Sequence, residues 1–115
     1  METYKHLLGV KYKAGGRTVE EGMDCYGVAI EVYREEGKYL ADKLSDPKEF
    51  LEHLEPLSNP EIKSLIAFYN KQDVCYHIAV YLGNGVMIHS RDKYGVCIEP
   101  LRRFPSARKE YYRVY

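Results

Sequence analysis

Hydrophobic and polar positions follow a helical period in one stretch of the first half of the chain. Between residues 25 and 37 the apolar side chains recur at intervals of one, three and four. They are Val28, Ala29, Val32 and Tyr33. This spacing places them on one face of a helix of about three turns, whereas Glu31 and Arg34 fall mainly off that face. Gly37 follows the pattern and predicts the end of the helix.

The second half of the chain predicts strands instead. Runs rich in β-branched and aromatic residues, bounded by turn-forming residues, occupy residues 64–69, 76–82, 86–90, 95–98 and 111–114. Asn84-Gly85 is a turn signal between the second and third runs. Two further helices are predicted, over residues 3–8 and 46–54, and the second opens with a cap, a proline and a glutamate. Helices first and strands later indicate an α+β fold with helices packed on an antiparallel sheet.

The predicted core draws on both halves of the chain. It comprises Leu7, Leu8, Val28, Val32, Leu65, Ile66, Ile78, Val80, Ile88 and Val96. With 115 residues and 45% hydrophobic content, the chain is predicted to be a single domain over residues 1–115. Its 17 basic and 17 acidic residues cancel, which argues against a general nucleic-acid-binding protein. The sequence contains no apolar run long enough for a membrane span.

Cys25 is the candidate nucleophile, because it follows a suitable helix cap. Asp24 can accept hydrogen bonds from the first turn of the predicted helix, which puts Cys25 at the first helical position. The positive end of a helix and a nearby imidazolium both favour a thiolate, so we expect the pKa of Cys25 to lie below that of a free thiol. Three cysteines exclude a complete disulfide framework, and we interpret Cys75 and Cys97 as buried, inert thiols.

His77 and His89 are the candidate partners of this thiol, and the turn between them constrains how they can act together. A regular two-residue loop at Asn84-Gly85 would place the two imidazoles on opposite faces of the hairpin. A three-residue loop that includes Gly83, or a bulge, would set Ala79 opposite His89 and bring both rings onto one face. We favour the three-residue loop, and we expect the Cys25 helix to pack on that same face.

The order of these motifs resembles the NlpC-type family of cell-wall cysteine endopeptidases. The segment from Leu8 to Gly16, followed by Asp24-Cys25-Tyr26-Gly27, is similar to the entry motif of that family. The segment from His77 to His89 is similar to its second block, with the same spacing of 12. The resemblance implies a papain-like fold and the hydrolysis of stem peptides of bacterial peptidoglycan, often between D-γ-glutamyl and a diamino acid.

The resemblance also assigns roles to individual residues. Cys25 would be the nucleophile, His77 the base, and His89 the residue that orients the base. Tyr12 and Asp24 match positions that often line the substrate site, and Tyr26 stands beside the expected cleft where the family usually has serine. The implied reaction is acyl transfer to water through a thioester, which needs no metal or organic cofactor.

Other interpretations of these residues remain open at this stage. A zinc site built from Cys25, Cys75, His77 and His89 has suitable ligand types but lacks the usual knuckle spacing. Relatives of the lecithin-retinol-acyltransferase type place histidine before cysteine, the reverse of the order here. A catalytically inactive module of the same fold, which binds wall peptides or belongs to a phage tail, would keep the groove.

The expected partners and location follow from this interpretation. Peptidoglycan stem peptides or wall fragments are the expected partners, together with phage tail proteins if the chain is phage-encoded. The first residues lack the apolar core of a signal peptide. We therefore expect synthesis in the cytoplasm, followed by association with a phage or release to the cell wall. His6 and His53 are predicted to lie on helix surfaces, away from any chemistry.

Overall fold

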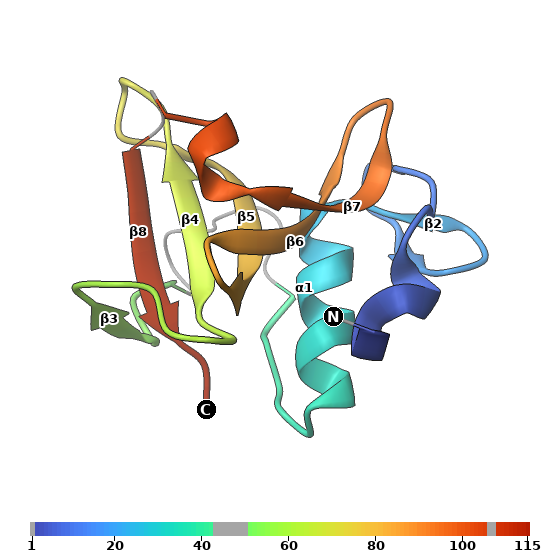
Figure 1. Cartoon of the computed structure of the whole chain (residues 1–115), viewed down its shortest axis with the longest axis horizontal. Coiled ribbons are helices and arrows are strands. Elements are labelled where there is room, and N and C mark those ends of the chain that lie inside the picture. Colours follow the sequence, from blue (N-terminus) through green and yellow to red (C-terminus); the bar gives the residue numbers. More distant parts are fainter. Residues whose placement is uncertain (1, 43–50, 106–107) are drawn as a thin grey trace.

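One helix packs against a six-stranded antiparallel sheet, which confirms the predicted α+β class (Figure 1). The structure, a computed structural model, describes residues 2–42, 51–105 and 108–115. The helix is α1 (Cys25–Glu35). The strands of the sheet, in the order in which they pair, are β3 (Glu55–Leu57), β8 (Arg108–Arg113), β4 (Leu65–Tyr69), β5 (Cys75–Gly83), β6 (Val86–Arg91) and β7 (Gly95–Pro100).

Four short elements complete the described fold. Three of them were not predicted, because runs of two or three residues are too short to show a periodic pattern. The four are the 3-10 helices η1 (Glu2–Leu7) and η2 (Leu101–Arg103) and the paired strands β1 (Arg17–Thr18) and β2 (Gly22–Met23). The helix predicted over residues 3–8 is thus a 3-10 helix. The helix predicted over residues 46–54 lies mostly outside the described residues. Strand β3 was not predicted because it contains Pro56, which an edge strand tolerates.

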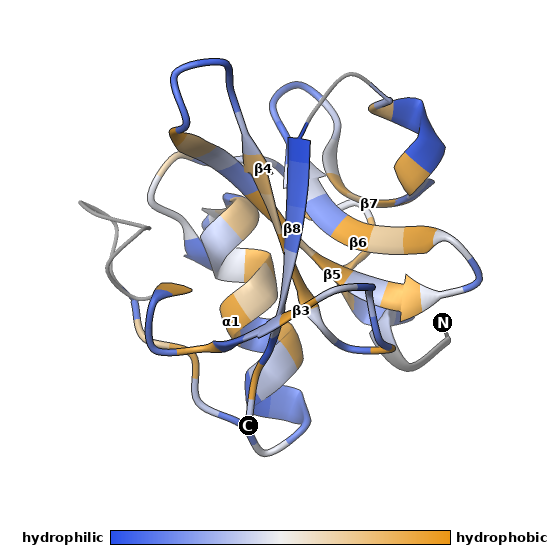
Figure 2. Ribbon diagram, turned by 90° about the vertical axis from the view of Figure 1, so that its left-hand side faces the viewer, coloured by the Kyte–Doolittle hydropathy of each residue, from blue (hydrophilic) through white to orange (hydrophobic). Residues whose placement is uncertain are grey.

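The sheet buries residues on both of its faces. Ile78, Val80 and Ile88 belong to the main core, together with residues of α1. Ile66, Phe68, Ala79 and Met87 form a second cluster, against which Leu101 and Phe104 pack. Figure 2 shows hydrophobic residues concentrated in α1, β5 and β6, whereas β8 is largely hydrophilic. The predicted core residues are buried except Leu8, which is 41% exposed because the chain turns there, with the Leu8 N–H bonded to the Lys5 carbonyl.

The hairpin between β5 and β6 has a two-residue turn combined with a bulge. Gly83 pairs with Val86 across Asn84-Gly85, and both turn residues have the positive φ of a type I′ turn, 53° and 76°. The predicted three-residue loop is therefore wrong. Between Tyr81 and Gly83 the register shifts, so that Val80 pairs with Ile88. This register, extended by one residue, sets Ala79 opposite His89 and puts both histidines on one face, as the bulge alternative required.

Gly83 is the residue that permits this bulge, and its replacement tests the register. It has a φ of 97°, and a Cβ there would lie 3.1 Å from the Ile62 side chain. We expect Gly83→Val to destabilise the protein by about 1–3 kcal/mol and to reduce hydrolysis by misaligning the two histidines. Gly85→Asn is the matched control, because nothing lies within 4 Å of its Cβ and asparagine tolerates positive φ. Thermal unfolding and hydrolysis rates that do not differ between the two variants would contradict this role.

Candidate active site

Asp24 fixes the start of α1 and thereby the position of Cys25. Its Oδ1 accepts hydrogen bonds from the Gly27 N–H at 2.8 Å and from Arg17 Nη1 at 2.7 Å, and its Oδ2 accepts from the Gly15 N–H at 3.0 Å. The side chain is therefore the predicted N-cap and also ties the preceding loop to the helix. Cys25 follows as the first residue of α1.

Close packing of two glycines holds the same helix start against the loop before it. A Cβ at Gly27 would lie 2.3 Å from the Gly16 carbonyl oxygen, and a Cβ at Gly16 would lie 2.2 Å from the Gly22 carbonyl oxygen. Both carbonyls belong to the backbone, so they cannot move aside as the end of a flexible side chain could. The backbone around Cys25 is thus packed so closely that only glycine fits at these two positions.

We expect Gly27→Ala to impair the site even though alanine favours helices. The added methyl group must push the Gly16 loop away from α1, at a cost of about 1–3 kcal/mol, and it displaces Cys25 with the helix start. The measurements are the free energy of unfolding and the hydrolysis rate. Gly37→Ala is the control, because its Cβ would meet nothing within 4 Å. Because Gly37 has a positive φ, Gly37→Ala should lower the stability of the protein, but the activity per folded molecule should stay unchanged.

The Cys25 sulfur lies near the end of the hydrogen-bonded ladder that joins β5 to β6. The ladder between these strands extends from the turn to the Val80–Ile88 pair. Beyond that pair, the Ile78 N–H lies close enough to the Cys25 sulfur to lower its pKa, as does the Tyr26 N–H. On β6, Ser90 Oγ donates a hydrogen bond of 2.7 Å to the Met23 carbonyl and so holds the segment that leads into α1.

The helix and the histidines occupy opposite faces of the sheet, which corrects the expectation that they share one. Ile78 and Val80 face α1, whereas the alternate positions His77 and Ala79 face the second cluster. Cys25 nevertheless lines the same pocket as His77, because the helix start reaches it at the end of the β5–β6 ladder.

The two imidazoles contact each other directly. His77 Nε2 lies 2.8 Å from His89 Nδ1, and the ring centroids are 5.0 Å apart. Phe68 packs on His77 with centroids 5.3 Å apart, and Phe104 packs on His89 with centroids 5.8 Å apart. His89 is fully buried and His77 half-buried. The pair is therefore held in fixed orientation by aromatic neighbours and by its own hydrogen bond.

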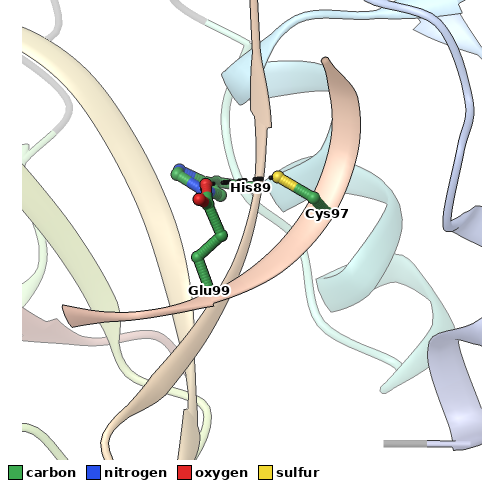
Figure 3. Close-up of side chains that lie close together, drawn as sticks. All are labelled: His89, Cys97 and Glu99. Carbon is green, nitrogen blue, oxygen red and sulfur yellow. Dashed lines mark hydrogen bonds and ion pairs between the residues drawn. The ribbon is translucent and has the colours of Figure 1, made fainter. Parts of the chain in front are cut away.

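Glu99 extends this pair, and the sequence analysis missed it. Its Oε1 lies 2.8 Å from His89 Nε2 and 3.3 Å from the Cys97 sulfur. Figure 3 shows the three side chains close together. Arg91 Nη1 donates to both carboxylate oxygens at 3.1 and 3.0 Å, and Arg103 Nε lies 2.8 Å from Oε2. Alternation along the sequence places residues 97 and 99 on one face of a strand, but only the pairing of Cys97 with His89 in the structure brings Glu99 to the imidazole.

Burial sets the protonation states of the thiol and the first imidazole. It raises the pKa of Cys25 to about 11, with a smaller contribution from the Asp24 charge, and outweighs the lowering by the Ile78 N–H. Burial lowers the pKa of His77 to about 3, and smaller contributions come from the repulsion that a protonated His89 would exert and from the Arg91 charge. The expected direction for Cys25 is therefore wrong, because desolvation of the sulfur exceeds the lowering by the Ile78 and Tyr26 N–H groups. The resting site contains a neutral thiol and a neutral imidazole.

The pocket at the site has a volume of about 380 Å³. Besides Cys25 and His77 its lining comprises Tyr12, Phe68, Tyr76, Ser90, Arg91, Asp92 and Phe104. Tyr12 thus lies where the substrate role predicted for it requires. Asp24 is bonded to the helix start and Tyr26 belongs to the main core, and neither is among the lining residues. Their predicted contacts with substrate stay predictions.

The described residues bring together a different group of metal-ligand types from the one considered in the sequence. His89, Cys97 and Glu99 offer ligand atoms within 4.8 Å of one another. Arg91 and Arg103 already neutralise the carboxylate of this group, which opposes binding of a cation.

The remaining cysteine and histidine predictions concern residues away from the pocket. Cys75 is buried, and its sulfur donates to the His77 carbonyl at 3.5 Å. Cys97 is half-buried beside Glu99. His6 is exposed on a 3-10 helix and contacts Glu35, whereas His53 is exposed but lies in a turn and not on a helix. In the part of the chain that the structure describes, no helix combines the length and apolar character needed to cross a membrane.

The chain is similar in sequence to proteins of one family. A family model described as the NlpC/P60 family matches residues 9–113. The gamma-DL-glutamyl hydrolase of Bacillus subtilis (strain 168) is 33% identical over 98 residues, which cover 82% of this chain and 23% of the relative. The murein DD-endopeptidase MepH of Escherichia coli (strain K12) is 28% identical over 93 residues, which cover 78% of this chain and 34% of the relative.

A solved structure shows the same fold. The crystal structure of an NlpC/P60 family protein from Bacillus cereus ATCC 10987 superposes with a TM-score of 0.78 at 27% identity, and covers 95% of this chain and 37% of that one. The chain therefore spans between about a quarter and a little over a third of the proteins it is compared with here.

Proposed function

Because the chain belongs to the NlpC/P60 family, we propose that it is a cysteine peptidase that hydrolyses peptide bonds in peptidoglycan stem peptides. The observation that carries this proposal is one pocket lined by both Cys25 and His77, with His89 bonded to His77. A thiol that lines the pocket, a neutral base and a residue that orients the base are the parts that nucleophilic acyl transfer needs.

The first half of the reaction forms a thioester. The Cys25 sulfur attacks the carbonyl carbon of the scissile amide while His77 accepts the thiol proton. Backbone N–H groups at the start of α1 are suited to stabilise the resulting oxyanion, because they lie at the positive end of the helix. The carbon–nitrogen bond then breaks, and His77 gives its proton to the leaving amine.

The second half of the reaction releases the acyl group. His77 removes a proton from water, the hydroxide oxygen bonds to the thioester carbon, and the carbon–sulfur bond breaks. The proton on His77 returns to the Cys25 sulfur, which restores the starting state. Because the resting pair is neutral, the proton must pass from Cys25 to His77 in the course of the reaction.

The proposed bond joins D-γ-glutamyl to a diamino acid. The similarity to a gamma-DL-glutamyl hydrolase supports a γ-glutamyl bond. The similarity to a murein DD-endopeptidase supports peptidoglycan as the substrate, without specifying this bond. Tyr12 and Tyr76 line the pocket and offer flat surfaces with hydroxyl groups, which suit a polar peptide.

A digest of purified peptidoglycan, analysed by mass spectrometry, tests the proposal. We expect the wild-type protein to release stem-peptide fragments whose masses correspond to cleavage after D-γ-glutamyl. A synthetic γ-glutamyl–diamino acid peptide should be cleaved at the same bond. Protein that binds the wall in a pull-down but releases no fragment from any of these substrates would instead support the inactive wall-binding or phage tail module.

A further inference from the structure

Glu99 ends a chain of hydrogen bonds that begins at His77 and passes through His89. Resting on the proposed function, we propose that Glu99 is a positioning residue, which selects the tautomers of both imidazoles so that Nδ1 of His77 acts as the base. Glu99 does so through His89, since it is not among the residues that line the pocket.

The tautomers follow from the acceptor at the end of the chain. Burial opposes ionisation of Glu99, but hydrogen bonds from His89 and Cys97 and the charge of Arg91 hold its pKa below the usual value. An ionised carboxylate can only accept a hydrogen bond, so the proton of the 2.8 Å contact lies on His89 Nε2.

The hydrogen bond between the two imidazoles then determines the tautomer of His77. Burial lowers the pKa of His89, so the ring is neutral and carries a lone pair on Nδ1. His77 Nε2, 2.8 Å away, must then carry the proton and donate it to His89 Nδ1. In a neutral His77 this leaves the lone pair on Nδ1, the nitrogen that is not used by His89. That nitrogen can accept the Cys25 proton.

Two arginines complete this group of hydrogen-bonded side chains. Arg91 and Arg103 both donate to Glu99, and Arg91 also lies over the rings of Tyr94 and Phe104, 4.6 and 5.3 Å from their centroids. Their charges offset the carboxylate and so help to keep His89 neutral. A doubly protonated His89 would donate from both nitrogens and would force His77 Nε2 to accept, which would place the His77 proton on Nδ1.

The replacements Glu99→Gln and Glu99→Asp separate this role from simple packing. In Glu99→Gln the two arginines retain the amide oxygen as their acceptor, so the amide nitrogen turns to His89 and reverses both tautomers. We expect kcat to fall by about 100-fold or more with KM little changed. Glu99→Asp keeps an acceptor-only charge and should retain more activity than Glu99→Gln, although glutamine matches the shape of glutamate better. A packing role would reverse that order, and Glu99→Gln with activity equal to or above Glu99→Asp would overturn the proposal.

Nitrogen NMR of the imidazoles gives a second readout that does not depend on hydrolysis. In the wild-type protein we expect His77 to be protonated on Nε2 and unprotonated on Nδ1, and the reverse in Glu99→Gln. A wild-type His77 protonated on Nδ1 would refute the positioning role even if both variants failed to fold. Absence of hydrolysis by the wild-type protein would refute the proposed function alone, because the tautomers can still be measured.

Discussion

Replacing Cys25 with alanine is expected to abolish hydrolysis and to leave the fold intact. No other group in the pocket lining can form the thioester, so the rate should fall on the order of 10⁴-fold or more, to background. The fold should survive because Asp24 caps α1 through contacts with Gly27, Arg17 and Gly15 that do not involve the Cys25 side chain. Release of peptidoglycan fragments and the circular dichroism spectrum together measure both effects.

Cys75→Ser is the matched control for this prediction. Cys75 is buried outside the pocket, and a serine hydroxyl can make the same hydrogen bond to the His77 carbonyl. Its activity should stay close to that of the wild-type protein. If Cys25→Ala instead digests peptidoglycan at the wild-type rate, the protein is not a cysteine peptidase.

Replacing His77 with alanine is expected to have the next largest effect. The variant lacks the imidazole proposed to accept the Cys25 proton, and hydrolysis should fall on the order of 10³-fold. Because the resting thiol is already neutral, the loss should arise in the chemical step and not in the ionisation of Cys25. His6→Ala is the control, since His6 lies on the surface and contacts Glu35.

The pH dependence of Cys25 alkylation tests the neutral pair within this same prediction. With the pKa of Cys25 raised to about 11 and that of His77 lowered to about 3, the pair stays neutral throughout the range between the two values. Alkylation of Cys25, followed by mass spectrometry of its peptide, should therefore be slow near neutral pH and should accelerate only in alkaline solution. Mass spectrometry is preferable to ultraviolet titration because twelve tyrosines also ionise in that range.

The His77→Ala variant should show nearly the same alkylation profile as the wild-type protein. A thiolate paired with an imidazolium would behave differently, since it would react rapidly in mildly acidic solution and would lose that reactivity without His77. Rapid alkylation of the wild-type protein at acidic pH, lost on replacement of His77, would show that the ion pair exists after all.

The local pattern of the sequence determined the elements that carry the site. The apolar positions Val28 and Val32 fixed the helical face, and Asp24 fixed its start, so Cys25 could be placed at the first position of α1. The runs around His77 and His89 had the composition of strands, and the turn at Asn84-Gly85 joined them. These features depend on residues close together in the chain, and therefore the sequence alone was sufficient.

The sequence determined the register of the hairpin only in part. Alternation showed that the two histidines need one unpaired residue to share a face, but it could not place that residue in the loop or in the strand. The structure places it between Tyr81 and Gly83. Tyr81 makes backbone hydrogen bonds to Lys63 and Ser64, on the neighbouring part of the chain, and Ile62 packs at Gly83. Contacts with a segment about twenty residues away thus decide the position of the bulge.

Tertiary structure alone decided the remaining features of the site. Glu99 forms a hydrogen bond with His89 because β7 pairs with β6. Nothing near His89 in the sequence identifies Glu99 as its partner. The direction of the Cys25 pKa shift was likewise beyond local reasoning. The helix end is a local property that favours a thiolate, whereas desolvation depends on every segment that covers the sulfur, and desolvation is the largest cause of the raised pKa.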